Sequence, residues 1–292
     1  MHACRAPAGI EMQFTEEQIK IAKRLTLGAA VYQNYHLRDG IFEEQFKDGY
    51  KALVCFVEHY AYERQGAAPA YPIIAKMTIE QIFRGKLPSV TQTHAEEAWK
   101  IYKEIARKDF NNIKLNESRN PMSSDEGVLA AMSTHRIGNL SLCVKELIQQ
   151  DRTAEAYSFV ASVRGVGSKI APFYLRDIAY LGNLAESKIK DPHYLQPIDT
   201  WLEQTLSIIF GDEAPRKPME KQKIIVELCK AAGCSPIAFN QGAWVLGSQV
   251  AGSFKMFREI AEGKNARSIL QKHVLSMKQY VAEVEKIVGK FG

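Results

Sequence analysis

The residue types that could do chemistry in this chain gather around a short glycine-rich segment. Residues 163–169 read Val-Arg-Gly-Val-Gly-Ser-Lys and lie between two apolar runs with helical spacing. Gly165 and Gly167 allow a positive φ and a close approach of the backbone to a ligand. The amides after them would open a helix, and a helix N-terminus is a natural site for a phosphate. Lys169 would then lie beside that phosphate, so the segment is suited to holding a DNA backbone next to a nucleophile.

A carboxylate follows at the start of the next predicted helix. Asp199 stands after Pro197 and 30 residues beyond Lys169. An ionised carboxylate can stabilise positive charge that develops on a reacting carbon, and it can help to relay a proton. Plainer roles also fit these residue types. Lys169 could contact only a phosphate, and Asp199 could serve only as the N-cap of a helix over 200–210.

A further pair of residues has the spacing of a binding surface. Asn240 and Trp244 lie four residues apart in a helical stretch, so they share one face of that helix. A base turned out of a duplex needs a hydrogen-bonding group and a stacking surface, and this pair offers both. The alternative interpretation is a core tryptophan with an amide on the surface.

The glycine-rich segment and the carboxylate resemble those of the helix-hairpin-helix DNA glycosylases. Hairpins of that family typically read Leu-Pro-Gly-Val-Gly-x-Lys, followed by an apolar helix and Val/Ile-Asp, and this chain supplies residues 163–169 and 198–199. Residues 169–178, Lys-Ile-Ala-Pro-Phe-Tyr-Leu-Arg-Asp-Ile, are most similar to the archaeal 8-oxoguanine branch, whose helix reads roughly Lys-x-Ala-x-x-Phe-Leu-Arg-Asn-Ile. The similarity extends over about residues 120–250.

Two features depart from the family pattern. Arg164 stands where the hairpin usually has proline. The interval from Lys169 to Asp199 is longer than in most members, although one archaeal 8-oxoguanine branch has a comparable insertion.

The resemblance implies an enzyme of base-excision repair. It implies a bifunctional DNA N-glycosylase and apurinic/apyrimidinic (AP) lyase that removes a damaged base, an oxidised purine such as 8-oxoguanine, from double-stranded DNA. Lys169 would attack the sugar C1′ and form a Schiff base, with Asp199 as its catalytic partner. Archaeal members carry an Asp and a Trp at the spacing of Asn240 and Trp244, so this pair would bind the base.

The hairpin backbone has implied roles of its own. By resemblance, the DNA phosphate is bound at Gly165, Val166, Gly167 and Ser168. The family also holds a monovalent cation, Na⁺ or K⁺, which here would be bound by the backbone carbonyls of Ala161, Val163 and Val166. We expect no required cofactor and no iron–sulfur cluster, because Cys229 and Cys234 lack further cysteines at a suitable spacing. The alternative for the hairpin is an ordinary tight turn between two helices.

Two other functions stay open on the residues alone. One is a catalytically silent module that uses the same hairpin to bind DNA, and the other is an N-glycosyl hydrolase acting on RNA or a free nucleoside. Lys169 favours the lyase, because monofunctional relatives lack this lysine. The sequence has no Gly-x4-Gly-Lys-Ser/Thr phosphate-binding loop and no Gly-x-Ser-x-Gly nucleophile motif.

Helical periodicity dominates the chain and predicts an all-α fold. A capped helix start is expected at Thr15, and no stretch alternates convincingly as a strand. Further helices are expected near 41–65, 71–84, 93–109, 124–132, 135–150, 153–163, 168–181, 199–210, 217–232, 236–247, 252–262 and 266–290. The resemblance implies a two-lobed helical bundle with DNA between the lobes. One lobe would be the helix-hairpin-helix lobe 85–205, the other would join 13–84 to 206–292, and 1–12 would be a disordered lead-in.

The last predicted helix, 266–290, is unusually long. Its apolar residues gather along one side, which we expect to pack onto the body of the protein. They are Ile269, Leu270, Val274, Met277, Val281, Val284 and Val288.

Composition is that of a soluble globular protein: 292 residues, 46% hydrophobic and 24% charged. No apolar run is long enough for a transmembrane helix. The net charge of +5 suits an anionic partner such as DNA. Five scattered cysteines are too few for a disulfide framework. The cysteines therefore predict a reducing compartment, either the cytoplasm in association with the nucleoid or the nucleus. We also expect the protein to be a monomer.

Overall fold

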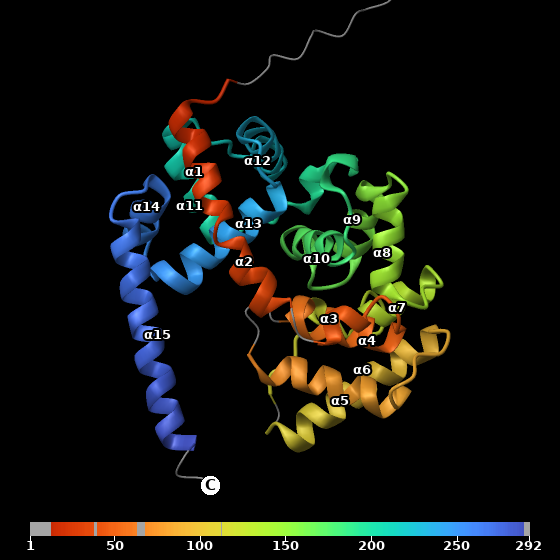
Figure 1. Cartoon of the computed structure of the whole chain (residues 1–292). Helices are drawn as coiled ribbons and strands as arrows, with labels where there is room; N and C mark the ends of the chain where they lie inside the picture. The colour runs from red at the N-terminus through yellow and green to blue at the C-terminus, as the bar shows by residue number, and fades with distance from the viewer. Residues whose placement is uncertain (1–12, 38–39, 63–67, 112, 289–292) are drawn as a thin grey trace, which may run out of the picture.

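The structure is a computed structural model that describes residues 13–37, 40–62, 68–111 and 113–288 (Figure 1). The predicted lead-in over 1–12 lies outside the described residues. These residues form helices and contain no strand, so the fold is all-α, as the periodicity predicts. The α-helices are α1 (Glu16–Thr26), α2 (Ala29–Val31), α3 (Gly40–Glu44), α4 (Gly49–Cys55), α5 (Ala70–Phe83), α6 (Gln92–Asp109), α7 (Val128–Thr134), α8 (Leu140–Gln149), α9 (Thr153–Ser162), α10 (Gly167–Leu181), α11 (Thr200–Phe210), α12 (Pro218–Ala232), α13 (Pro236–Val245), α14 (Phe254–Glu262) and α15 (Ala266–Val288). Shorter 3-10 and π segments are η1 (Tyr32–His36), η2 (Phe56–Tyr62), η4 (Glu117–Arg119), η5 (Glu186–Lys188), η6 (Pro192–Leu195), η7 (Gly211–Glu213) and η8 (Leu246–Ala251).

Capping side chains explain where several helices begin. At the start of α1 the Thr15 hydroxyl accepts a hydrogen bond from the Gln18 amide at 3.2 Å, and the Gln18 side-chain oxygen accepts one from the Thr15 amide at 2.9 Å. This reciprocal pair is a capping box and confirms the predicted start. The single helix predicted over 41–65 is instead α3, a turn, and α4 running into η2. The break occurs because Asp48 caps a new helix, where its side chain accepts hydrogen bonds from the amides of Tyr50 and Lys51.

Buried side chains form two hydrophobic clusters. The larger is built mainly by α4–α10 with η2, and the smaller by α1 with α11–α14. The predicted lobes divide the chain differently, because they join 13–84 to 206–292. In the structure the buried side chains from Leu37 to Phe83 pack with those of residues 90–195. α1 instead contributes side chains to the smaller cluster, where it packs against α12 and α13.

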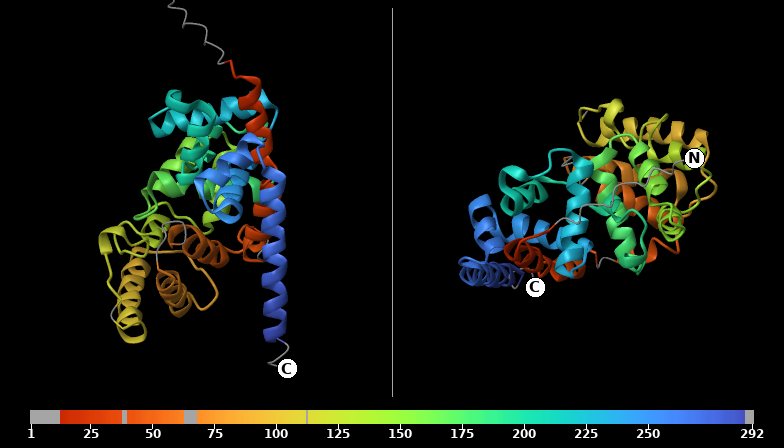
Figure 2. Two further views of the ribbon diagram at one scale, coloured as in Figure 1. Left: turned by 90° about the vertical axis from the view of Figure 1, so that its left-hand side faces the viewer. Right: turned by 90° about the horizontal axis from the view of Figure 1, so that it is seen from above.

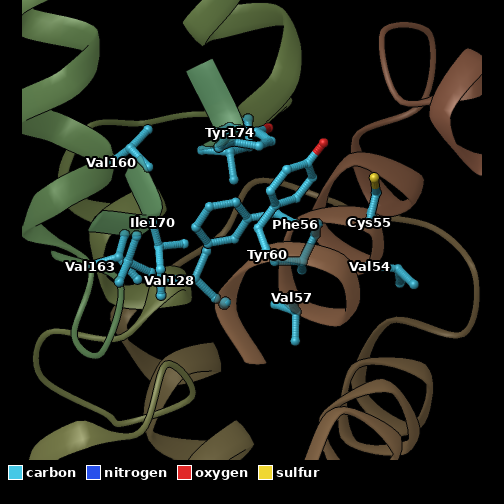
Figure 3. Close-up of a cluster of buried hydrophobic side chains, with 14 of the residues drawn as sticks. Val54, Cys55, Phe56, Val57, Tyr60, Val128, Val160, Val163, Ile170 and Tyr174 are labelled. Atoms are coloured by element: carbon cyan, nitrogen blue, oxygen red, sulfur yellow. The ribbon is translucent and has the colours of Figure 1, made fainter. Parts of the chain in front are cut away.

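α10 lies at the centre of the larger cluster (Figure 1). Its Tyr174 ring packs edge-on against Phe56 and Tyr60 of η2, with ring centroids 4.9 and 5.0 Å apart. Val163 and Ile170, which flank the glycine-rich turn, lie in the same buried cluster (Figure 3). The turn is therefore fixed by core packing on both of its sides.

α15 corrects the prediction made for the last helix. Its Ile269 is buried against the smaller cluster at 7% exposure. Beyond that first turn the helix runs alongside the molecule as a separate rod (Figures 1 and 2). Five of the other apolar residues expected to pack on the body are 37–50% exposed: Leu270, Val274, Met277, Val281 and Val284. The side chain of Val288 lies outside the described part of the structure. The prediction was wrong for the five exposed residues because the main packing partners of α15 are α14 and η8, near the buried Ile269.

None of the helices in the described part of the chain is long and apolar enough to span a membrane.

The described cysteines form no disulfide with one another: Cys55, Cys143, Cys229 and Cys234. Cys4 lies outside the described residues.

Candidate functional site

The glycine-rich segment forms a tight turn between α9 and α10. Gly165 and Gly167 have φ angles of 80° and 61°, in the left-handed region that favours glycine. The Val166 amide donates a hydrogen bond to the Val163 carbonyl at 3.0 Å and closes the turn. A Cβ atom added to Gly167 would meet no atom within 4 Å, so the space in front of the α10 N-terminus is open.

Arg164, which stands in place of the family's proline, anchors this turn to the loop before α7. Its amide donates to the Glu126 carbonyl at 2.7 Å. Its guanidinium donates to the carboxylates of Asp125 and Glu126 at 2.9 and 2.7 Å. The charge of Arg164 is thus paired within the protein. Its backbone bond and its two side-chain bonds fix the turn at a position where proline would have restricted φ.

Asp199 is the N-cap of α11. Its Oδ1 accepts hydrogen bonds from the amides of Trp201 and Leu202 at 3.0 and 2.9 Å. The capping interpretation of this residue is therefore correct. No hydrogen bond to Oδ2 is found among the described residues, so this second oxygen keeps its capacity for a ligand or a proton. Capping and catalysis can use different oxygens of one carboxylate.

The structure brings the predicted lysine and carboxylate into one region. Asp199 is only 9% exposed, and burial raises the pKa of its carboxyl above the ordinary value. The Leu202 amide, the Arg176 guanidinium, the Trp201 amide and the Lys169 ammonium oppose this rise in the pKa. Lys169 is exposed in the first turn of α10, and its charge acts on the Asp199 carboxylate across the 30 intervening residues of sequence.

A fully buried ion pair lies behind this region. Arg176 donates from Nε to Asp177 Oδ1 at 2.8 Å, and both side chains have no exposed surface. Tyr32 and Tyr60 donate to Asp177 Oδ2 at 2.8 and 3.1 Å. Burial alone would lower the pKa of Arg176, but the Asp177 carboxylate and Tyr32 outweigh it and keep the guanidinium charged. Such a pair is tolerated in a core because hydrogen bonds satisfy both partners.

Asn240 joins this ion pair to the segment that carries Asp199. Its Oδ1 accepts from Arg176 Nη1 at 2.8 Å, and its Nδ2 donates to the Pro197 carbonyl at 3.0 Å. Asn240 is fully buried. This geometry corrects the predicted role in base binding, because both polar atoms are engaged inside the protein. The alternative of a surface amide is equally wrong. Asn240 instead holds Pro197, two residues before Asp199.

Trp244 lies on the same helix as Asn240, as the spacing predicts, but at a different depth. It is half-buried, and its ring meets those of Tyr32 and His36 edge-on at centroid distances of 5.6 and 5.1 Å. Both partners come from η1, near the N-terminus. Sequence reasoning missed them because neither residue belongs to a motif, and 200 or more residues of sequence separate them from Trp244.

The predicted cation site is made of backbone carbonyls at the end of α9 and in the turn. The Val163 carbonyl accepts the Val166 amide and so already has one partner. Among the described residues, no group of three or more His, Cys, Asp or Glu side chains could hold a metal ion. That finding concerns side chains, so the carbonyl site at Ala161, Val163 and Val166 stays a prediction.

A cavity of about 500 Å³ lies away from the turn, between η5, η6, α12 and α13. Its wall includes Gln196, Cys229 and Cys234 but not Lys169 or Asp199. The candidate site is therefore an open surface around the α10 N-terminus rather than this cavity.

Comparison with protein-family models, with curated proteins and with solved structures finds no match to this chain.

Proposed function

We propose that this protein is a DNA glycosylase with AP lyase activity that removes an oxidised purine, such as 8-oxoguanine, from double-stranded DNA. The observation that carries the proposal is that Lys169, exposed in the first turn of α10, lies near enough to the buried Asp199 for its charge to oppose the rise in the pKa of that carboxyl. An exposed amine supplies the nucleophile, and a carboxylate with a free oxygen supplies charge stabilisation.

The proposed reaction starts at the sugar of the damaged nucleotide. The uncharged Nζ of Lys169 attacks C1′, the bond from C1′ to the base breaks, and the base leaves with the bonding electrons and takes up a proton. Asp199, through Oδ2, stabilises the positive charge that develops on the sugar. Ring opening then gives a Schiff base, and loss of a C2′ proton expels the 3′ phosphate and nicks the strand.

Binding of the DNA backbone is assigned to the turn and the first residues of α10. Gly167, Ser168 and Lys169 are exposed there, and the free amides of a helix N-terminus favour an anion. Arg164 is not part of this surface, because its guanidinium is bonded to two carboxylates. Trp244, which is half-buried beside His36 of η1, is the proposed stacking surface for the base.

Borohydride trapping tests the proposal directly. The protein is incubated with borohydride and an 8-oxoguanine duplex, an abasic duplex or an undamaged duplex. We expect a covalent adduct with the two damaged duplexes, loss of the adduct in Lys169→Gln with duplex binding retained, and an unchanged adduct in Lys100→Gln. Lys100 is a matched control because it is an exposed helical lysine on α6.

Other outcomes point to the rival functions. Duplex binding without any adduct or released base would identify a silent DNA-binding module. Release of base from RNA or a free nucleoside, but not from the duplex, would identify an N-glycosyl hydrolase. A full-strength adduct in Lys169→Gln would show that the nucleophile lies elsewhere.

A further inference from the structure

α15 leaves an apolar stripe uncovered along most of its length. The helix has 23 residues and is therefore about 35 Å long. Its main packing partners are α14 and η8, and Ile269 in its first turn is the α15 residue that belongs to the smaller buried cluster. The stripe consists of Leu270, Val274, Met277, Val281 and Val284, each 37–50% exposed. Soluble proteins rarely leave so continuous an apolar surface open to water unless it binds something.

The spacing of the stripe identifies the shape of its partner. Its five residues follow one another at intervals of four, three, four and three residues. This is the a and d pattern of a heptad repeat, with Val274 and Val281 at a and Leu270, Met277 and Val284 at d. A 3.5-residue repeat keeps its apolar seam in contact with another helix that has the same repeat. A globular groove would not require that regularity.

We propose that α15 forms a parallel, two-stranded coiled coil with α15 of a second copy of this chain. A second copy supplies the matching seam without any further component. β-branched residues at a combined with leucine at d favour two parallel strands. Both a positions in the stripe are valine, and the d positions are Leu270, Met277 and Val284.

The residues beside the seam disfavour the antiparallel orientation. In a parallel pair each g residue lies near the partner's e residue five positions on, so Tyr280 meets the partner's Glu285 and His273 meets the partner's Lys278. The Tyr280 hydroxyl can donate to that carboxylate. The antiparallel register that aligns the whole stripe would instead place Lys278 against the partner's Lys278, and like charges at such positions are destabilising.

The seam also faces a direction that a second molecule can approach. Successive residues of a helix are about 100° apart, so the centre of the stripe lies about a quarter turn from Ile269, which packs on the body. A partner helix would thus lie beside the body. With little more than two heptads, the interface is smaller than a standard one of about 1,600 Å². We therefore expect a dissociation constant in roughly the micromolar range, in place of the monomer predicted from sequence.

Sedimentation velocity over about 1–200 µM of the full chain tests this dimer, since its population depends on protomer concentration. The test variant is Val281→Asp, which would place two carboxylates in one apolar layer. At about 6 Å and an effective dielectric constant near 20, their repulsion weakens association roughly 100-fold. The matched control is Leu275→Asp. Leu275 is 60% exposed on the same helix but lies about 140° around it from the centre of the stripe.

We expect the wild type and Leu275→Asp to dimerise with the same dissociation constant, and Val281→Asp to dimerise about 100-fold more weakly with unchanged helicity by circular dichroism. Val281→Cys should also give a disulfide-linked dimer on mild oxidation, because a residues meet in a parallel pair. A wild type that stays monomeric throughout the range overturns the proposal. So does a dimer that Val281→Asp leaves intact, or one that both aspartate variants weaken equally. Base excision is not the readout, so this outcome is independent of the proposed function.

Discussion

Replacing Asp199 with asparagine separates its capping role from its proposed catalytic role. The asparagine Oδ1 can keep both capping bonds, now 3.0 and 2.9 Å long, and asparagine caps helices about as well as aspartate. The change in capping should therefore alter the free energy of unfolding by less than ~0.5 kcal/mol. Removing a charge at 9% exposure also relieves the desolvation that raises the pKa of this carboxyl.

The effect on excision should be far larger. A carboxylate about 4 Å from a cationic sugar contributes ~4 kcal/mol at an effective dielectric constant of 20. Loss of one such preorganised group typically lowers kcat about 10²–10³-fold. Single-turnover release of 8-oxoguanine from a duplex measures this loss, and thermal melting measures the stability of the same samples.

Asp48→Asn is the matched control. Asp48 caps α4 with the same geometry, since its Oδ1 accepts from the amides of Tyr50 and Lys51 at 2.8 and 3.2 Å. It has no part in the proposed site, so its replacement should leave excision unchanged. If Asp199→Asn excises the base at the wild-type rate, this residue is only a helix cap. An equal loss in both variants would show that excision reports on folding rather than on charge.

Three further predictions follow from the site. Burial raises the pKa of Asp199 above 3.8, so the rate of excision should begin to fall on acidification while the pH is still above 3.8. The pH profile of Asp199→Asn should lack this acidic decrease. The folded state favours the protonated acid, so urea titrations should show the wild type losing stability relative to Asp199→Asn as the pH rises from 3.8 through the raised pKa. Gly167→Ala should cost ~1–2 kcal/mol and weaken duplex binding in a fluorescence titration, because its φ is 61°. Gly138→Ala, whose Cβ also meets open space without a positive φ, should change neither, and equal behaviour of the two would contradict the backbone argument. Asn240→Ala should cost roughly 1–3 kcal/mol by stranding two buried partners and should slow base excision and abasic cleavage alike, whereas Trp244→Ala should slow excision about 10- to 100-fold more than abasic cleavage. Kinetics on paired 8-oxoguanine and abasic duplexes that reverse these two patterns would show Asn240, not Trp244, to be the base contact.

Local features of the fold could be predicted from the sequence because they depend on neighbouring residues. The glycine-rich turn and the N-cap at Asp199 follow from residue types that stabilise them wherever they occur. The helices follow from periodicity, although their ends shift where a cap such as Asp48 interrupts an apolar run. Periodicity cannot show which helices share a core, so the packing of Leu37 to Phe83 with the central helices did not emerge.

The depth of a side chain was the main property that sequence could not provide. Helical spacing places Asn240 and Trp244 on one face, but it does not say that the first is fully buried and the second only half-buried. Arg176 would ordinarily be expected at the surface, because its charge is costly to bury without a partner. Its place in the core depends on Asp177 and on Tyr32, which lies 144 residues away in sequence.

The position of α1 has a consequence for how the chain folds during its synthesis. Gln18 donates to the Ile209 carbonyl at 3.1 Å, and Arg24 donates to the Ala261 carbonyl at 3.0 Å. The first helix therefore has to wait for partners that leave the ribosome more than 190 residues later. At translation rates of about 5–20 residues per second, this interval is roughly 10–50 s. The apolar face of α1 stays without its native cover for that time, so the smaller core can close only after α14 has been made.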